Sequence, residues 1–227
     1  MQKADELDVL SLCRLFDSVD RRDIELLLNS LQARWIERQA RSFFLPQHTR
    51  TEDVTVLISG LAAGESISPD GKTAVVNEFK PGDVFGDVLA GSFVPSQVSV
   101  KAVTDCSAVS FAFPKLLAPD AALPQIRAIV LRNLIAHISE KYFAMRTRLN
   151  ILLGGAIRRR ILLYLHLYGG CGAEAFFIPH NREEMAAYLG CERSALSREL
   201  SQMRAEGLID FRLNRFHITS RDYWDSI

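Results

Sequence analysis

The sequence lacks the features that define several classes of protein. No part of its 227 residues approaches the run of about 20 apolar residues that a transmembrane helix needs. The N-terminal segment, residues 1–8, is acidic and has no basic region followed by an apolar one, which a secretory signal needs. We therefore expect a cytoplasmic protein that has no membrane partner.

Cysteine is scarce and widely spaced. The four residues are Cys13, Cys106, Cys171 and Cys191, with no Cys-x-x-Cys pair and no histidine at metal-ligand spacing. The sequence also lacks a glycine-rich phosphate loop and any spacing of nucleophile and base that is typical of a catalytic site. We expect no disulfides, no metal, no certain cofactor, no catalytic residues and no enzymatic activity.

Charges of the two signs balance over the whole chain, with 27 basic and 27 acidic residues. Their distribution is uneven, because residues 1–118 have a net charge of −4 and residues 119–227 a net charge of +4. From residue 151 onward all ten basic side chains are arginine. Since a guanidinium can form two hydrogen bonds at once with phosphate or guanine, the C-terminal part is the better candidate for contact with nucleic acid.

The apolar pattern of the first half predicts helices followed by strands. Up to about Gln39 it favours short amphipathic helices, with Asp20 as the N-cap of the second. From Val54 onward, segments rich in Val, Phe and Thr alternate with turn sequences, which predicts an antiparallel β-barrel or roll. The expected strands are residues 54–59, 73–79 and 98–113, and the expected turns are residues 69–72 and 80–83.

A long helical pattern begins after Pro124. Its apolar residues recur at alternating spacings of four and three, the heptad pattern of a helix that pairs with another helix. One interpretation buries this stripe on the helix's own domain. We favour a dimer seam, because a second stripe that includes Val130 and Leu134 can cover the β-domain instead. Gly154 and Gly155 predict a hinge after the helix. The predicted seam consists of Leu131, Ile135, Ile138, Tyr142, Met145, Leu149 and Leu152.

The C-terminal part has the pattern of a helix-turn-helix. Asn181, with Glu184 three residues later, predicts a capped helix that ends at Gly190, and a second helix starts at Arg193. The N-terminal end of such a second helix is where base edges are read. Short strands at residues 209–211 and 216–218 predict a wing. The residues predicted to bind DNA are Arg182, Arg193, Ser194, Ser197, Arg198 and Arg215.

The most specific stretch, residues 189–200 followed by Glu206-Gly207-Leu208-Ile209, resembles the cyclic AMP receptor protein / fumarate-nitrate reduction regulator (Crp/Fnr) family. Residues 57–60, 70–72 and 81–87 extend the resemblance into the β-domain. It implies an α+β fold with an N-terminal antiparallel β-roll (a jelly roll like that of cyclic-nucleotide-binding domains), a long dimerisation helix and a C-terminal winged helix-turn-helix. The corresponding domains are residues 1–118, 119–153 and 154–227.

The same resemblance implies a function. Members are transcription regulators that bind palindromic, double-stranded promoter DNA as homodimers, and a small molecule, cofactor or redox signal controls them. The operator would then be an inverted repeat, and RNA polymerase would be a further partner. Many members read cytosine with a Glu in the recognition helix, where Ser194 stands here, so the preferred promoter should differ.

The departures from the family concern the sensing pocket. Members that bind cyclic nucleotides have Gly-Glu for the ribose and Arg-Ser or Arg-Thr for the phosphate, whereas Gly86-Asp87 and Ser96-Gln97 stand at these places here. Because burying a phosphate without a cation is costly, we expect an unknown small-molecule effector that is not a cyclic nucleotide. The predicted effector pocket consists of Phe85, Gly86, Asp87, Val88, Leu89, Ser96 and Gln97.

A redox or haem sensor on the same scaffold is the alternative function. Cys13 or Cys106 would be the thiol switch. His48, His137 or Cys106 would be the haem ligand, although none of them stands in a recognisable ligand pattern.

Overall fold

A computed structural model of the protein describes residues 2–67, 71, 73–92, 94–119, 122–169 and 175–220. Most of the turn predicted at residues 69–72 lies outside the described residues, and so does Cys171. The chain forms two compact units that divide within a long helix, between Glu140 and Lys141.

Short helices open the first unit, as the sequence predicts. Leu10, Phe16 and Leu27 are each at most 1% exposed and belong to one buried cluster. Asp20 occupies the N-cap position of the second α-helix with an extended backbone, although its side chain makes no capping hydrogen bond. The bounds are α1, Gln2–Leu12; η1, a 3-10 turn, Arg14–Phe16; and α2, Arg21–Ser30.

The helical prediction up to Gln39 is wrong at its end. Gln32 has a φ of 51°, the left-handed conformation in which helices commonly end. Arg34–Arg38 then forms strand β1, which pairs with β8 (Cys106–Ala112) and places Trp35 opposite Val109. Aromatic and β-branched residues such as Trp35 and Ile36 fit a pleated sheet better than a helix, which is the physical reason for the change.

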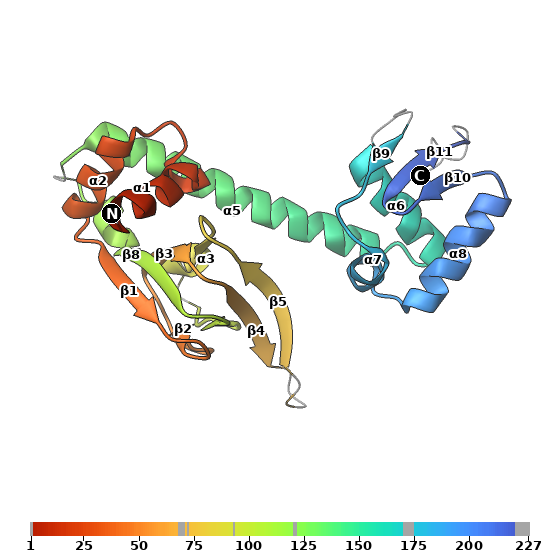
Figure 1. The fold of residues 1–227 in the computed structure, drawn as a ribbon, viewed down its shortest axis with the longest axis horizontal. Helices are drawn as coiled ribbons and strands as arrows, with labels where there is room; N and C mark the ends of the chain where they lie inside the picture. The colour runs from red at the N-terminus through yellow and green to blue at the C-terminus, as the bar shows by residue number, and fades with distance from the viewer. Residues whose placement is uncertain are drawn as a thin grey trace. The chain divides into compact units, whose positions relative to one another are not determined.

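Eight strands among the described residues form two antiparallel sheets with strand orders β1-β8-β3-β6 and β2-β7-β4-β5 (Figure 1). One buried cluster draws residues from both sheets, including Leu57 and Phe79, so the two sheets face each other across it. The N-terminal β-roll is thereby confirmed. The other bounds are β2, Phe43–Leu45; β3, Asp53–Ser59; β4, Ala62–Ile67; β5, Thr73–Phe79; β6, Val84–Phe85; and β7, Ser99–Ala102.

The strands predicted at residues 54–59 and 73–79 are confirmed by β3 and β5. The single strand predicted over residues 98–113 is two strands instead, because β7 and β8 belong to different sheets. The chain turns between them, and there the Asp105 carboxylate accepts a hydrogen bond of 2.8 Å from the Ala40 amide.

The long helix predicted after Pro124 is α5, Pro124–Leu152. Val130 and Leu134 lie on its buried side and join the cluster of the N-terminal helices. The buried Arg127 guanidinium donates to the Ala122 carbonyl and to the Ser30 hydroxyl, both at 2.7 Å, and so ties the first turns of α5 to α2. Two one-turn helices come before α5: α3, Asp87–Ala90, and α4, Phe113–Leu116.

The second unit is a winged helix-turn-helix. A buried cluster that includes Tyr164, Met185, Leu196 and Met203 holds its helices together. Three short strands form one antiparallel sheet in the order β10-β11-β9. The bounds are α6, Ile157–Gly169; β9, Phe176–Phe177; α7, Arg182–Leu189; α8, Arg193–Ala205; β10, Ile209–Arg212; and β11, Arg215–Ile218.

The capping box predicted at the start of α7 is confirmed. Asn181 Oδ1 accepts from the Glu183 and Glu184 amides at 2.9 and 3.0 Å, and the Glu184 carboxylate accepts from the Asn181 amide at 2.8 Å. We expect Asn181→Ala to lower the free energy of unfolding of this unit by about 1 kcal/mol. Urea unfolding measures the change, with Asn150→Ala on the exposed side of α5 as the control. An unchanged midpoint in Asn181→Ala would show that the cap contributes nothing.

Candidate functional site

The turn between α7 and α8 brings the two helices of the motif together. Gly190 lies at the C-cap of α7 with φ 62° and ψ 46°, a left-handed conformation that glycine adopts without strain. Ala186, which is 3% exposed, is small enough to let α8 cross close to α7. Leu196 and Leu200 of α8 are buried on that side, so the opposite side of α8 is left to solvent.

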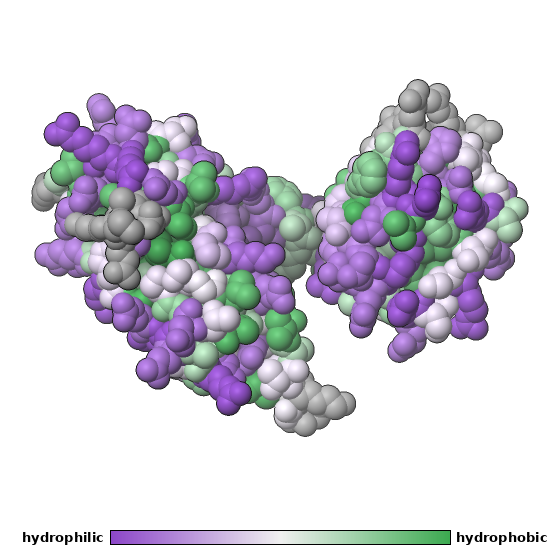
Figure 2. Space-filling view, in the orientation of Figure 1, coloured by the Kyte–Doolittle hydropathy of each residue, from purple (hydrophilic) through white to green (hydrophobic). Residues whose placement is uncertain are grey.

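The N-terminal half of α8 presents four of the residues predicted to bind DNA. Arg193, Ser194, Ser197 and Arg198 are all exposed. The Ser197 hydroxyl donates to the Arg193 carbonyl at 2.9 Å, which leaves its oxygen free to accept from a base amino group. Hydrophilic side chains predominate on the viewed face of this unit (Figure 2). The face combines guanidinium donors and small hydroxyl groups, the set that can read base edges in a major groove.

A bidentate ion pair, which the sequence analysis missed, holds α8 against α6. Arg158 of α6 donates from Nε to Glu199 at 2.5 Å and from its two terminal nitrogens to Glu206 at 2.7 and 2.9 Å. The guanidinium lowers the pKa of the Glu206 carboxyl, and the two carboxylates raise the pKa of Arg158. The spacing of seven residues between the two glutamates, on one side of α8, is the signal that could have revealed this contact.

Arg182, also predicted to bind DNA, is engaged within the protein. It donates to the Leu213 carbonyl in the wing turn at 2.9 Å, and its guanidinium lies 5.0 Å from the ring centroids of both Phe211 and Phe216. Burial of the half-buried side chain lowers its pKa. Arg182 therefore fixes the wing to the start of α7, whatever it contributes to DNA contact.

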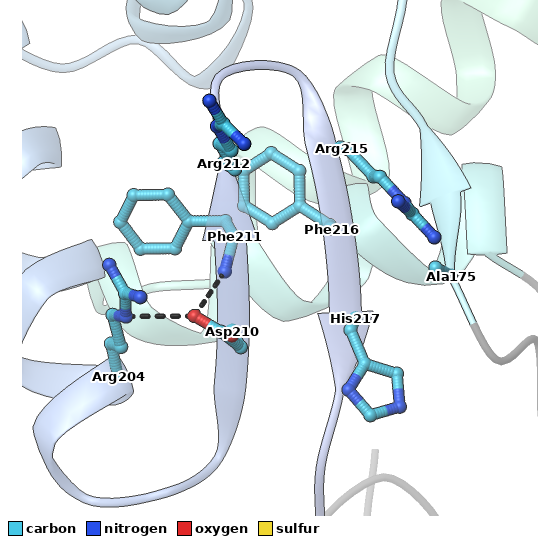
Figure 3. A pocket seen from close by; sticks show the side chains of 8 residues that line it. All are labelled: Ala175, Arg204, Asp210, Phe211, Arg212, Arg215, Phe216 and His217. Atoms are coloured by element: carbon cyan, nitrogen blue, oxygen red, sulfur yellow. Dashed lines mark hydrogen bonds and ion pairs between the residues drawn. The ribbon is translucent and has the colours of Figure 1, made fainter.

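The wing forms one side of an open groove of about 550 Å³ (Figure 3). Arg212 and Arg215 face each other in the β10–β11 ladder next to the turn, and His217 lies farther along β11. Arg204 of α8 reaches the groove as well, where its Nε donates to Asp210 at 2.8 Å. The sequence analysis singled out only Arg215 from this group. The groove is basic and continues the line of arginines on α8.

The interior of the β-roll is filled by aromatic side chains. Phe85 is 4% exposed, and its ring centroid lies 5.2 Å from that of Phe44 and 5.3 Å from that of Phe79. Beside it remains a cavity of about 50 Å³, which Phe85 and Gly86 help to line. None of the described residues that line this cavity is a lysine or an arginine.

The other predicted pocket residues do not line this cavity. Val88 and Gln97 are exposed, Leu89 is half-buried, and the Ser96 hydroxyl is bonded to the Val98 carbonyl within its own loop. Asp87 is buried at the start of α3, and its Oδ2 lies 3.7 Å from Nε2 of His137 on α5. Of the predicted pocket residues, Phe85 and Gly86 therefore line the cavity, while Asp87, Val88 and Leu89 lie in α3 and Ser96 and Gln97 in a loop.

Burial disfavours the thiolate of two cysteines. It raises the pKa of Cys13 to about 11 and also raises the pKa of Cys191. Because the thiolate is the reactive form, these two thiols are poor redox switches. The buried Cys106 thiol donates to the Leu61 and Thr104 carbonyls at 3.1 and 3.3 Å.

The α5 stripe predicted as a dimer seam is only partly covered. Leu131 and Ile138 pack against the cluster of the first unit. The other five seam residues are exposed, from 38% at Leu152 to 66% at Met145. Phe143, which is 57% exposed, adds to the apolar surface of this stretch and was not predicted.

Two further searches concern membranes and metals. No helix in the described part of the chain has the length and apolar character needed to cross a bilayer. Among the described residues, no three His, Cys, Asp or Glu side chains are grouped as metal ligands.

The fold is shared with solved structures of low sequence identity. A catabolite activator protein of Thermus thermophilus is 20% identical, with a TM-score of 0.56 over 94% of this chain and 97% of that one. A c-di-GMP responsive global regulator of Xanthomonas campestris, CLP, is 18% identical, with a TM-score of 0.55 over 88% and 100%. A putative cyclic nucleotide binding protein of Ruegeria pomeroyi is 24% identical, with a TM-score of 0.51 over the full length of both chains. These likenesses show the fold alone.

Two family models match the sequence itself. Residues 38–118 match the cyclic nucleotide-binding domain, and residues 159–223 match the Crp-like helix-turn-helix domain. A comparison with curated proteins gave no match. The families that match are those of transcription regulators rather than enzymes. With a sensing roll, a long helix and a DNA-binding unit in this order, the chain belongs to the Crp/Fnr family of transcription regulators.

Proposed function

We propose that the protein binds an inverted-repeat operator as a homodimer, with α8 of each protomer in the major groove. The observation that carries this proposal is the exposed face of Arg193, Ser194, Ser197 and Arg198 on a helix that Arg158 holds in place. The basic groove at the wing adds phosphate contacts beside it. Such a regulator works in the cytoplasm, where the DNA is, and RNA polymerase is the further partner we propose.

The apolar surface of α5 supports the homodimer. Ile135, Tyr142, Met145 and Leu149 are each more than half exposed, and they recur at the heptad spacing of a helix pair. A second copy of α5 would cover them. In a two-fold dimer the recognition helices of the two protomers can reach major grooves about 34 Å apart, which is one turn of DNA. We propose residues 119–153 as the dimerisation helix and hinge, between a sensing domain (1–118) and a DNA-binding domain (154–227).

The filled roll supports an effector other than a cyclic nucleotide. Sites for small molecules usually measure about 300–1,000 Å³, whereas the cavity beside Phe85 is about 50 Å³. Its charged lining residue is Asp53, which pairs with Arg34 and would repel a phosphate. We propose either a very small, largely apolar effector or control that does not use the interior of the roll. The raised pKa of Cys13 argues against this residue as the thiol switch of the redox alternative.

Loss of an α8 arginine should change sequence preference. If Arg193 or Arg198 bonds a guanine in two places, its replacement by alanine should weaken binding by about 1–3 kcal/mol and relax the preference at that base pair. Fluorescence anisotropy measures this on a duplex that the wild-type protein selects from a random library, with Arg132→Ala on α5 as the control. If both variants keep the affinity and the preference of the wild type, α8 does not read the DNA.

Loss of a wing arginine should have a different signature. Arg212→Ala and Arg215→Ala should each weaken binding to all sequences alike and reduce the slope of log affinity against log salt by roughly 1, because a phosphate contact carries no base information. The same titrations, repeated at several salt concentrations, measure the slope. If the loss of affinity instead depends on the DNA sequence, Arg212 and Arg215 contact bases rather than the phosphate backbone.

Charges on the seam should dissociate the dimer. We expect the double variant Ile135→Glu, Met145→Glu to be monomeric, because a paired helix would bury both carboxylates in an apolar seam. Ala144→Glu, one residue from Met145 but outside the seam, is the matched control and should stay dimeric. Sedimentation equilibrium decides between the two states. A dimeric double variant would show that α5 is not the interface.

Cyclic nucleotides should not bind. Isothermal titration of the purified protein with cyclic AMP and with cyclic GMP should show no binding at micromolar concentrations, since the cavity beside Phe85 is too small for a nucleotide and no lysine or arginine is among the described residues that line it. Micromolar binding of either nucleotide would mean that the roll opens and finds a phosphate contact elsewhere.

A further inference from the structure

The last turns of α5 are built into the DNA-binding unit. Ile151 is 2% exposed and belongs to the same buried cluster as Leu189 and Leu196 of the helix-turn-helix. Gly154, predicted to be part of a hinge, is closely packed: a Cβ there would lie 2.9 Å from the Ile151 carbonyl oxygen and 3.1 Å from a methyl group of Leu163. The corner between α5 and α6 is therefore closely packed at Gly154, whereas a Cβ on Gly155, which has a φ of 74°, would meet nothing within 4 Å.

Arg148 of α5 contacts α7 in two ways. Its guanidinium donates to the Ala187 carbonyl at 3.2 Å and lies over the ring of Tyr188, 5.2 Å from the centroid. The carbonyls at the end of a helix lack helical partners and carry a partial negative charge, so a cation suits them. Arg160 of α6 donates to two carbonyls farther along the same helix end, those of Leu189 at 2.6 Å and Gly190 at 3.2 Å.

Leu152 packs on the turn of the motif. A Cβ on Gly190 would lie 2.9 Å from a methyl group of Leu152, so a side chain at position 190 would displace the Leu152 side chain from this contact. Gly190 thus meets two requirements at once, since its left-handed backbone makes the turn and its missing side chain admits Leu152.

The ring of Tyr188 joins these contacts to the start of α7. Its centroid lies 5.3 Å from that of Tyr164 and 5.2 Å from that of His180. Tyr164 and His180 are themselves joined by a hydrogen bond of 2.7 Å, and His180 precedes the capping residue Asn181. Both ends of α7 are therefore held, one by α6 and the other by α5 and α6.

We infer that Arg148, Leu152 and Tyr188 form a clamp that makes the end of α5 and the helix-turn-helix one rigid body. Through this clamp, the pairing of two α5 helices sets the distance and angle between the two copies of α8. The three are positioning residues that determine which spacing of operator half-sites the dimer accepts. The inference rests on the proposed function as a DNA-binding dimer, and it places any bending between sensing and DNA-binding units before Arg148 rather than at Gly154–Gly155.

Spacing variants of the operator test the clamp. The probes are the duplex that the wild-type dimer selects from a random library and the same duplex with one base pair inserted or removed at its centre, which turns one half-site by about 35° relative to the other. The wild type should prefer the selected spacing by about tenfold or more, and Arg148→Ala and Tyr188→Leu should reduce this preference to about threefold or less. Affinity for a duplex with a single half-site should change little, because α8 itself is intact.

Conservative variants separate positioning from folding. Arg148→Lys keeps the cation and Tyr188→Phe keeps the ring, so both should retain the spacing preference. Arg146→Ala is the matched control, because Arg146 is exposed on α5 two residues before Arg148 and is not part of the clamp. This variant should behave as wild type. Thermal unfolding of each variant confirms that it is folded.

The outcomes distinguish the clamp from the function on which it rests. If the wild type selects no duplex, DNA binding itself is wrong. If it selects an inverted repeat and Arg148→Ala and Tyr188→Leu, both folded, keep the full spacing preference, the clamp is wrong. The clamp is also wrong if the variants lose affinity for a single half-site as strongly as they lose the spacing preference. The variants would then act on α8 directly.

Discussion

The structure depends on one helix that has more apolar surface than its own chain covers. Val130 and Leu134 of α5 are buried in the first unit and Ile151 in the second, while Ile135, Tyr142 and Met145 between them are more than half exposed. A helix with apolar residues on more than one side needs more than one partner. The two units each bury part of this surface, and the proposed dimer would bury the part between them.

In the DNA-binding unit, three arginines hold α8, the end of α7 and the wing in place through contacts within the protein. Arg158 holds α8 through Glu199 and Glu206, Arg160 bonds the end of α7, and Arg182 fixes the wing. These arginines are engaged with carboxylates, carbonyls and aromatic rings. The arginines on the exposed side of α8 and on the wing are therefore the ones available to DNA. Because some arginines are paired within the protein and others are exposed on one side, a unit with a modest net charge can present a basic face.

The sensing unit has the fold of its family, and among its described residues aromatic side chains occupy the space between the sheets. Phe44, Phe79 and Phe85 come from three strands and fill the space between the sheets. One connection from this region to α5 is the contact between Asp87 and His137. A signal that reaches the roll has this contact as one route to α5, the proposed dimerisation helix.

The elements that the sequence predicts correctly are those with strong local signals. Asn181 with Glu184 and the left-handed Gly190 define α7 and its turn within ten residues, and the heptad pattern defines α5. The strands β2, β4 and β6 were missed because they are short, and β4 begins Ala-Ala-Gly, which carries no alternation. Strand β1 was taken for helix because its partner, β8, lies about 70 residues farther along the chain.

The roles of single residues were harder to predict than the elements, because they depend on contacts between distant segments. Arg182 looks like any other arginine at the start of a helix until Phe211 and Phe216 are placed beneath it. The effector pocket was predicted from a match of loops, and the contacts of Phe85 with Phe44 and Phe79 from other strands could not be read from that match. Arg148 and Arg158 carry no local sign of the groups they bond.

The central claim is that two copies of α8 read one turn of DNA as a pair. Sequencing the duplexes that the wild-type protein enriches from a random library tests it most directly. The account predicts an inverted repeat whose half-site centres lie about 10–10.5 base pairs apart. Enrichment of a single unpaired site, or of no sequence at all, would contradict it.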